Sequence, residues 1–454
     1  MTLSISFLGG VGTVTGSRSL LDRRGRRVLV DCGLFQGLKQ LRLRNWAKFP
    51  VDPASVDAVL LTHAHLDHSG YLPALVRDGF RGRVHAPQAT IDLCEILLKD
   101  SGFLQEKDAE YANKHGFSRH KPAAPLYTLK DAKAALLHLR AVPFHERHSL
   151  PDGPEILLRR AGHILGAASI VCRWGGASIA FSGDLGRFGD PVMVAPEAVP
   201  EADYVVVEST YGNRLHEKRD PQDALAEIVN RTVARGGTVV IRAFPGGSAQ
   251  PLLYRLDLPC PPGRIPGGPV FRDDPGPTNA TKWLHRHNGD HRLTPEECAR
   301  ACNVAQYVRG VEESKALTSN PMPKVVVSAS GMATGGRVLH HLKRYAPDKR
   351  NTILFSGFQA AGTRGADMLD GADRIKIHGE YIPVRAEVAN LPMLSAHADS
   401  DEIVKWLGSF RRPPKMTFIS HGEPEASDAL RRRIQDDLGW PCRVPEHLEK
   451  VVLE

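Results

Sequence analysis

The chain has 454 residues, of which 42% are hydrophobic and 24% are charged, which is ordinary for a globular protein. No window approaches the ~18 uninterrupted apolar residues of a membrane-spanning helix, so a transmembrane protein is excluded. Lys and Arg number 59 against 51 Asp and Glu, and the net charge of +8 permits a polyanionic partner without proving one. The length predicts two domains, one of them interrupting the other.

The start of the chain is typical of a half-buried strand, since Leu3, Ile5 and Phe7 alternate with polar residues. It has no basic stretch of the kind that opens an export signal. The seven cysteines include no CxxC pair, which argues against a disulfide framework and against a thiolate zinc knuckle. We therefore expect a reducing, cytoplasmic location and no membrane partner.

Short β-branched runs alternate with helical patterns along the chain, which indicates an α/β fold. Five of these runs end in polar residues that can bind metal or phosphate, and they lie at residues 59–61, 179–181, 204–207, 325–327 and 416–419. Open α/β sheets place their sites beyond such strand ends. The sequence therefore predicts that one edge of the fold carries the chemistry.

The first of these runs leads into His63-Ala64-His65-Leu66-Asp67-His68, an HxHxDH motif. Three imidazoles and a carboxylate within six residues can bind borderline cations such as Zn²⁺. Two His at i and i+2 can face one ion while Asp67 and His68 face a second. A chance cluster is a poor alternative, because the motif also has the strand-loop-helix context that such a site requires.

The segment from Leu256 to Thr281 is dense in Pro and Gly, and it predicts irregular loops around one short strand. Further along, small residues lead into a helical pattern at Val338–Tyr345 and expose backbone N–H groups where a phosphate is favoured. A turn with Arg364 repeats this arrangement. The predicted phosphate contacts are Ser330, Gly331, Thr334, Gly335, Arg337 and Arg364. The alternative for both segments is ordinary αβ-turn chemistry.

Three other His clusters lack carboxylate partners at ligand spacing, and we predict that they are surface residues. They lie at residues 145–148, 285–287 and 340–341.

With the HxHxDH motif in place, the chain resembles the metallo-β-lactamase superfamily of hydrolases. Asp31 in Leu29-Val30-Asp31-Cys32-Gly33 looks like the acidic residue that steadies the His loop. His163 in Gly162-His163-Ile164 looks like the next His ligand, and Asp184 in Ser182-Gly183-Asp184 looks like the aspartate that bridges two metals.

Three later motifs are similar to the A, B and C motifs of the β-CASP nucleases. They begin at Glu208, Ser395 and Ser420, and they contain Glu208, His397 and His421. In this family a cap is inserted in the lactamase fold, and a His in the third motif favours the RNA-processing branch. The resemblance implies a metallo-β-lactamase αββα sandwich with an inserted α/β β-CASP cap domain. It implies lactamase segments at 1–208 and 379–454 and a cap at 209–378.

The resemblance assigns His63, His65, His163 and Asp184 to a first metal, and Asp67, His68, Asp184 and His421 to a second. His397 is expected to act as the general acid with Glu208 orienting it, and Asp67 and Asp184 join them in the catalytic set. We expect two Zn²⁺, with Mn²⁺ as the alternative. The implied function is metal-dependent hydrolysis of single-stranded RNA by a two-zinc bridging-hydroxide mechanism in the cleft between the domains.

The cap departs from the family pattern at residues 242–250 and 271–277, which puts in question how it holds RNA. Two alternatives stay open: a small-molecule hydrolase of the same superfamily, which the large insertion opposes, and a non-catalytic RNA-binding scaffold, which the complete ligand set opposes. The sequence does not decide between endonuclease and 5′-exonuclease action, and it leaves the natural RNA, the metal in vivo and formation of a homodimer open.

Overall fold

The computed structural model describes residues 2–116, 118, 120–243, 249–257, 268–273, 280–329 and 335–454. These residues form two compact units, unit 1 (residues 1–215 and 397–454) and unit 2 (residues 216–396). The domain boundaries expected from the sequence stay a prediction. None of the described helices combines the length and apolarity needed to cross a bilayer.

Unit 1 contains two seven-stranded sheets. In spatial order the first sheet contains β22 (Lys450–Leu453), β1 (Leu3–Gly9), β2 (Arg18–Arg23), β3 (Arg26–Val30), β4 (Ala58–Leu60), β5 (Arg83–Ala86) and β6 (Leu139–Ala141). The second contains β21 (Cys442–Arg443), β20 (Met416–Ser420), β11 (Tyr204–Glu208), β10 (Ala177–Phe181), β9 (Ala168–Trp174), β8 (Glu155–Arg160) and β7 (Arg147–Ser149).

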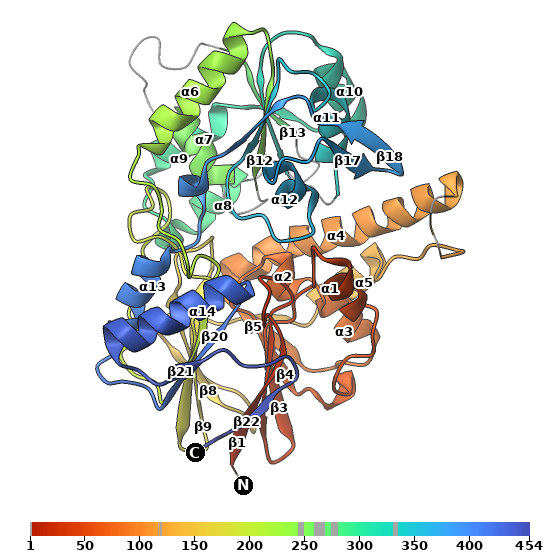
Figure 1. The fold of residues 1–454 in the computed structure, drawn as a ribbon. Coiled ribbons are helices and arrows are strands. Elements are labelled where there is room, and N and C mark those ends of the chain that lie inside the picture. Colours follow the sequence, from red (N-terminus) through yellow and green to blue (C-terminus); the bar gives the residue numbers. More distant parts are fainter. Residues whose placement is uncertain are drawn as a thin grey trace. The chain divides into compact units, whose positions relative to one another are not determined.

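The core of unit 1 lies between these sheets. Inward side chains such as Ile5, Phe7 and Leu60 from the first sheet join Ile170, Phe181 and others from the second in one buried cluster. The helices are α1 (Lys39–Arg44), α2 (Leu66–Ser69), α3 (Leu72–Arg77), α4 (Gln88–His115), α5 (Leu129–Leu136), α13 (Ser400–Leu407) and α14 (Pro424–Arg433). In Figure 1, α3 and α5 lie beside the first sheet and α14 beside the second, so the αββα sandwich expected from the sequence is confirmed.

The two termini of the chain are neighbours, because β22 pairs antiparallel with β1. The C-terminal segment also contributes to the second sheet, where β20 pairs parallel with β11. Residues after 397 therefore complete both sheets of unit 1, which brings residues from the two ends of the sequence to the same edge.

Unit 2 is built on a parallel sheet of β14 (Gln306–Val308), β13 (Val270–Asp273), β15 (Val325–Ala329), β12 (Val239–Ala243), β16 (Thr352–Phe355) and β19 (Glu387–Asn390). A separate hairpin contains β17 (Arg374–Ile377) and β18 (Glu380–Pro383). The helices are α6 (Pro221–Ala234), α7 (Ala249–Asp257), α8 (Ala280–Arg286), α9 (Pro295–Asn303), α10 (Val311–Ser319), α11 (Val338–Tyr345) and α12 (Arg364–Leu369).

Helices cover both faces of this parallel sheet, as buried parallel strands require. Side chains of α6 and α7 pack with Val239 and Ile241 on one face, and side chains of α11 and α12 pack with Val240 and Ile353 on the other. The helix expected at residues 338–345 is α11. The five β-branched runs singled out in the sequence all fall in strands, namely β4, β10, β11, β15 and β20.

Candidate metal centre

The HxHxDH motif forms the loop and short helix that follow β4. Asp31, which follows β3, fixes this loop: its Oδ1 accepts a hydrogen bond from the Thr62 amide at 2.8 Å, and its Oδ2 accepts one from the Thr62 hydroxyl at 2.9 Å. Oδ2 also lies 2.8 Å from Nδ1 of His68. Asp31 adopts a φ of 60° and His421 a φ of 49°, an uncommon backbone region for residues other than glycine. The surrounding structure therefore holds both residues in strained conformations.

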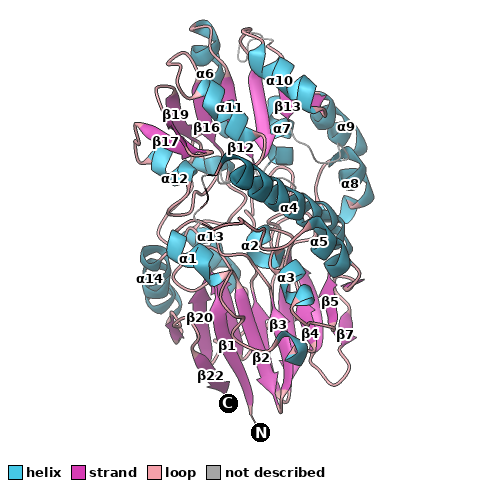
Figure 2. Cartoon of the chain, turned by 90° about the vertical axis from the view of Figure 1, so that its right-hand side faces the viewer, coloured by secondary structure: helices cyan, strands magenta, loops and turns pink. Residues whose placement is uncertain are grey.

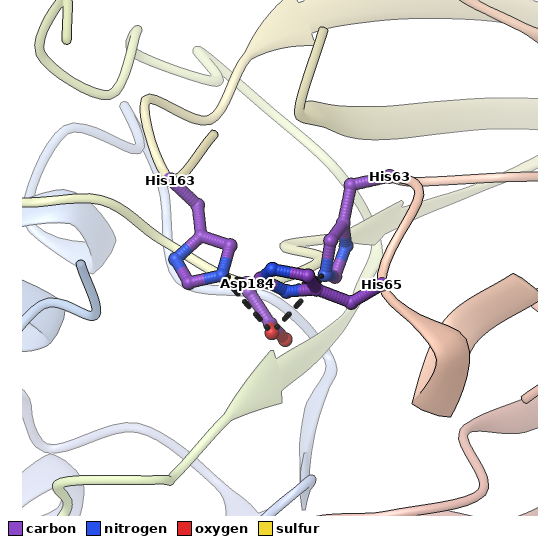
Figure 3. A group of neighbouring side chains, drawn as sticks. All are labelled: His63, His65, His163 and Asp184. Carbon is purple, nitrogen blue, oxygen red and sulfur yellow. Dashed lines mark hydrogen bonds and ion pairs between the residues drawn. The ribbon is translucent and has the colours of Figure 1, made fainter. Parts of the chain in front are cut away.

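A first group consists of His63, His65, His163 and Asp184, whose ligand atoms all lie within 4.8 Å of one another (Figure 3). Nδ1 of His65 lies 3.1 Å from Nε2 of His63 and 3.2 Å from Nε2 of His163. Oδ2 of Asp184 lies 3.4 Å from Nε2 of His63 and 3.7 Å from Nε2 of His163. Three nitrogens and one oxygen thus converge on one point.

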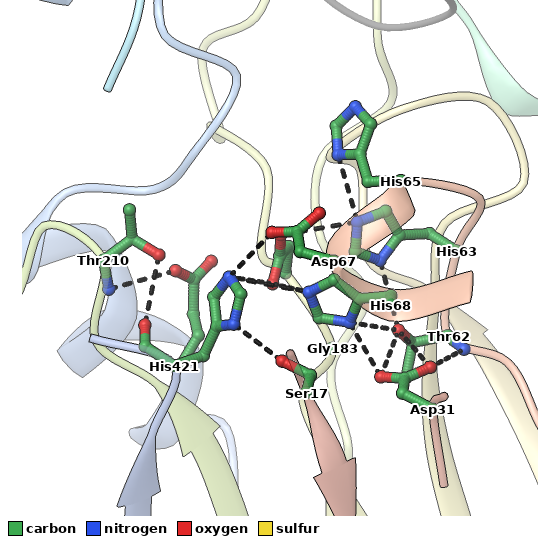
Figure 4. A network of polar contacts seen from close by, with 12 residues as sticks. Ser17, Asp31, Thr62, His63, His65, Asp67, His68, Gly183, Thr210 and His421 are labelled. Atoms are coloured by element: carbon green, nitrogen blue, oxygen red, sulfur yellow. Dashed lines mark hydrogen bonds and ion pairs between the residues drawn. The ribbon is translucent and has the colours of Figure 1, made fainter. Parts of the chain in front are cut away.

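A second group contains Asp67, His68 and His421 (Figure 4). Nε2 of His421 lies 3.5 Å from Nε2 of His68 and 3.8 Å from Oδ2 of Asp67. The other oxygen of Asp184, Oδ1, lies 3.2 Å from Nε2 of His68 and 3.5 Å from Nε2 of His421. Asp184 therefore presents one oxygen to each group.

The outer nitrogens of three of these imidazoles have oxygen partners. Nδ1 of His63 lies 3.1 Å from the Thr62 hydroxyl, and Nδ1 of His421 lies 2.7 Å from the Ser17 hydroxyl. His68 has the partner Asp31 already described. Such contacts fix the ring orientation and the tautomer of metal-binding histidines. Ser17 and Thr62 were not predicted from the sequence; Thr62 adjoins the motif, but Ser17 stands 404 residues from His421.

Burial and mutual contact shape the electrostatics of the two groups. Burial lowers the pKa of His65 and of His421 to about 3 and that of His63 well below its usual value. For Asp184, burial acts to raise the pKa, but the imidazoles of His421, His68 and His63 outweigh it and hold the pKa well below its usual value. For His68, burial acts to lower the pKa, but the carboxylates of Asp184 and Asp31 raise it well above its usual value.

The donor set fits a pair of divalent cations. Zn²⁺ binds His nitrogen and carboxylate oxygen at about 2.0–2.2 Å, so the edges of a tetrahedral site measure about 3.3–3.6 Å. Four of the six separations between donor atoms in the first group are 3.1–3.7 Å, which brackets that value, and all six are within 4.8 Å. In the second group Asp184 and two imidazoles have separations of 3.2–3.5 Å.

His397 and Glu208 lie beside the first group. Nδ1 of His397 is 3.3 Å from Oε2 of Glu208 and 4.0 Å from Oδ2 of Asp184, and its ring centroid is 4.3 Å from that of His163. Glu208 is buried, and its Oε1 accepts a hydrogen bond from the Leu185 amide at 2.6 Å. Burial acts to lower the pKa of His397, but the Glu208 carboxylate raises it to about 9.

All the predicted metal and catalytic residues, together with Asp31, thus gather at one site of unit 1. The predicted phosphate contacts belong to unit 2. Among these, Ser330, Gly331 and Thr334 are outside the described residues, and Gly335 and Arg337 precede α11.

Both predicted phosphate-binding arginines have partners inside unit 2. Arg337 donates to Oδ1 of Asp273 at 2.6 Å and to the carbonyl oxygens of Val308 and Arg309. Arg364 donates to the carbonyl oxygen of Lys376 at 2.6 Å. Their role toward phosphate stays a prediction.

One sequence prediction about His residues is wrong. His341 was expected on the surface, but it is fully buried, and its Nε2 lies 2.7 Å from Oδ2 of Asp273. Asp273 is 68 residues distant in the sequence, at the end of β13, so its carboxylate was missed as the partner.

Three family descriptions match the sequence. Residues 26–235 match the beta-lactamase superfamily domain, residues 249–368 the Beta-Casp domain, and residues 381–445 the Zn-dependent metallo-hydrolase RNA specificity domain.

Curated relatives cover nearly the whole chain. It is 37% identical to Ribonuclease TTHA0252 of Thermus thermophilus over 93% of this chain and 94% of that protein. It is 27% identical to an RNase J-like protein of Methanocaldococcus jannaschii over 97% of each chain, and 29% identical to the transcription termination factor FttA of the same organism over 95% of this chain and 69% of that protein. A solved structure of a protein of unknown function from Enterococcus faecalis shares the fold, with a TM-score of 0.52, 14% identity and full coverage of both chains.

Proposed function

This chain belongs to the β-CASP nuclease family of the metallo-β-lactamase superfamily, and we propose that it is a metal-dependent ribonuclease that uses two divalent cations. The observation that carries the proposal is the position of Asp184, whose two carboxylate oxygens face two separate groups of imidazoles. A single carboxylate in that position can serve two ions at once.

In this proposal, His63, His65, His163 and Asp184 hold the first ion, and Asp67, His68, Asp184 and His421 hold the second. When bound, two such ions would supply an activated water at neutral pH and would neutralise the charge that develops on the phosphate oxygens. Asp31, Ser17 and Thr62 hold the imidazoles in place.

His397 belongs to neither ligand set in this proposal, and it acts as the general acid. Glu208 holds Nδ1, so Nε2 is the nitrogen that gives its proton to the departing 3′ oxygen. Glu208 itself is fixed by the Leu185 amide, which keeps the imidazole in a constant orientation.

Three observations support RNA as the substrate. Two relatives that cover over 90% of this chain are named as ribonucleases or RNase J-like. One matching family is described as an RNA specificity domain. The net charge of +8 suits a polyanion.

The test is to incubate the purified chain with uniformly labelled and with end-labelled single-stranded RNA, with and without a chelator. A ribonuclease gives shorter products only without the chelator, and the product lengths separate internal cleavage from 5′-exonuclease action. A small-molecule hydrolase would leave both RNAs intact without retaining them, and a binding scaffold would retain them uncut. Either of those results would contradict the proposal.

A further inference from the structure

The segment Leu38–Lys48 of unit 1, which contains α1, is an unusual surface and is called the 38–48 platform below. Its helix buries no residue. Trp46 is 58% exposed and Leu43 is 54% exposed, and these two side chains lie three positions apart at the end of the helix. A helix with no buried face adds nothing to the core, and a large exposed apolar group beside it indicates a binding surface.

The platform carries uncompensated positive charge. Residues 33–51 contain Lys39, Arg42, Arg44 and Lys48 and no Asp or Glu. Within the described chain none of these four side chains forms an ion pair. Arg44 lies over the ring of Phe35, with 5.4 Å from Cζ to the ring centroid. Lys39, Arg42 and Lys48 are exposed and Arg44 is half-buried. The segment that carries the exposed indole thus also carries four cations, and none of them pairs with a carboxylate among the described residues.

Hydrogen bonds from a buried side chain hold the platform in place, although its helix α1 buries no residue. The buried side chain of Asn45 accepts a hydrogen bond from the Phe35 amide at 3.0 Å and donates one to the Phe35 carbonyl oxygen at 2.7 Å. This closes the segment into a loop whose base is the buried Phe35. Trp46 follows Asn45 directly, so its backbone is anchored while its ring is exposed.

Backbone contacts connect the base of the platform to the candidate metal centre. The Leu34 amide donates to the carbonyl oxygen of Leu66, which stands between His65 and Asp67, and the Cys32 amide donates to that of His68. The Gln36 amide donates to the hydroxyl of Thr15, in the loop that also contains Ser17. In Figures 1 and 2, α1 and α2 lie at the same end of the sheets of unit 1.

We propose that the 38–48 platform binds single-stranded RNA next to the metal centre, with a base stacked on Trp46 and the backbone phosphates held by Lys39, Arg42, Arg44 and Lys48. This inference rests on the proposed function. An exposed aromatic ring offers a flat surface that every base can use, and unpaired cations attract the phosphates whatever the sequence. A protein partner would need an apolar core free of charge. The platform instead carries four cations and no acidic residue.

Binding of a dye-labelled single-stranded RNA to the full, metal-containing chain tests the platform, read by anisotropy immediately after mixing. Trp46→Ala should weaken binding about tenfold or more, while Trp46→Phe, which keeps a stacking surface, should bind nearly as the unaltered chain does. Leu137→Ala removes an exposed apolar side chain at the opposite end of the first sheet, before β6, and should change nothing. Equal binding by the Trp46→Ala and unaltered chains would overturn the proposal.

The charges are tested by the salt dependence of the same binding. Arg42→Gln and Lys48→Gln should each reduce the slope of log Kd against log salt by about 0.7, the value for one single-strand phosphate contact. Arg24→Gln removes an exposed Arg from the turn between β2 and β3 and should leave the slope unchanged. An unchanged slope in the platform variants would contradict the proposal, because these cations would then not contact phosphate. A change of oligomeric state without loss of RNA binding would also contradict it and would indicate a protein contact instead.

Failure of the inference can be told from failure of the proposed function. Tryptophan fluorescence gives a reading that does not depend on cleavage, since RNA should quench the unaltered chain more than the Trp46→Phe variant. If RNA binds through Trp46 and is never cut, the ribonuclease proposal fails and the platform stands. If RNA is cut and neither Trp46 nor the charges affect binding or KM, the platform fails alone.

Discussion

The carboxylate of Asp184 is shared by both groups of imidazoles, whereas His421 contacts only the second. Asp184→Asn should therefore lose metal from both sites, and His421→Ala should lose it mainly from the second. Elemental analysis of the purified variants checks this expectation. Full occupancy in the Asp184 variant, or loss of both ions in the His421 variant, would contradict the shared-ligand arrangement.

The role of His397 can be separated from that of the ligands. His397→Ala should keep both metals and cut RNA more slowly by about 10²–10⁴, because the leaving oxygen departs without a proton. A nitrophenyl phosphodiester, whose leaving group needs no proton, should lose far less rate in the same variant. If both substrates slow equally, or if the metal content falls, His397 is a ligand or a support.

Residues close to a motif were easier to predict from the sequence than their distant partners. The four ligands of the HxHxDH motif stand directly after a strand, so the local pattern was enough to predict them. His163, Asp184 and His421 were assigned through the family resemblance. Ser17 contacts His421, which is 404 residues away, and His341 contacts Asp273, which is 68 residues away. The identity of a lone Ser or His does not reveal such a partner, so the Ser17 contact was missed and His341 was placed on the surface.

At the level of elements, the metal loop packs closely against the segment that follows β3. A Cβ on Gly33 would lie 1.6 Å from the carbonyl oxygen of Asp67 and 2.9 Å from the amide nitrogen of His68. Gly33→Ala should therefore displace the loop and weaken metal binding at the second site by about tenfold or more. Gly189→Ala is the matched control in unit 1, because a Cβ there meets no atom within 4 Å. Equal metal affinity in the two variants would show that the loop tolerates the shift.

The end of β13 carries a buried ion-pair cluster that should make the stability of unit 2 depend on pH. Burial acts to raise the pKa of Asp273, but hydrogen bonds from His341, Ser314 and Arg337 lower it. Because the pKa is lower in the folded chain than in the unfolded chain, Asp273 stabilises the fold above about pH 4, and this contribution is lost as the pH falls from there through the folded value.

Asp273→Ala should reduce the free energy of unfolding by on the order of 3–5 kcal/mol near neutral pH, since Arg337 and His341 lose their carboxylate. The difference from the unaltered chain should shrink as the pH drops below about 4. Thermal unfolding followed across pH checks both points, with the exposed Asp370→Asn as control. A difference that stays constant down to pH 2 would contradict the assignment.

Helices and strands were predicted correctly where the apolar residues recur at a regular helical or strand spacing. The expected helix at 338–345 and the five β-branched strands are present. In the Pro- and Gly-rich segment 256–281, β13 is the short strand that was expected, while much of the rest is outside the described residues. Helix α1 was not predicted, because it has no buried face and therefore no apolar period to detect.

At the level of the whole molecule, the candidate site depends on both ends of the chain. β20 and β22 of the C-terminal segment pair with β11 and β1, and this pairing places His421 against His68, 353 residues away. The sequence could suggest this closure only through the family resemblance, because no local pattern joins the two ends. Residues 397–454 are accordingly part of the same unit as the HxHxDH motif.

The most direct test of the account is a reconstitution titration. The chain is stripped with a chelator, Zn²⁺ or Mn²⁺ is added in steps, and bound metal per chain is measured alongside the rate at which single-stranded RNA is cut. We expect no cleavage by the stripped chain and a rate that reaches its maximum only as the second ion binds. Cleavage that persists without metal, or that is complete at one ion per chain, would contradict the proposal of two ions joined by Asp184.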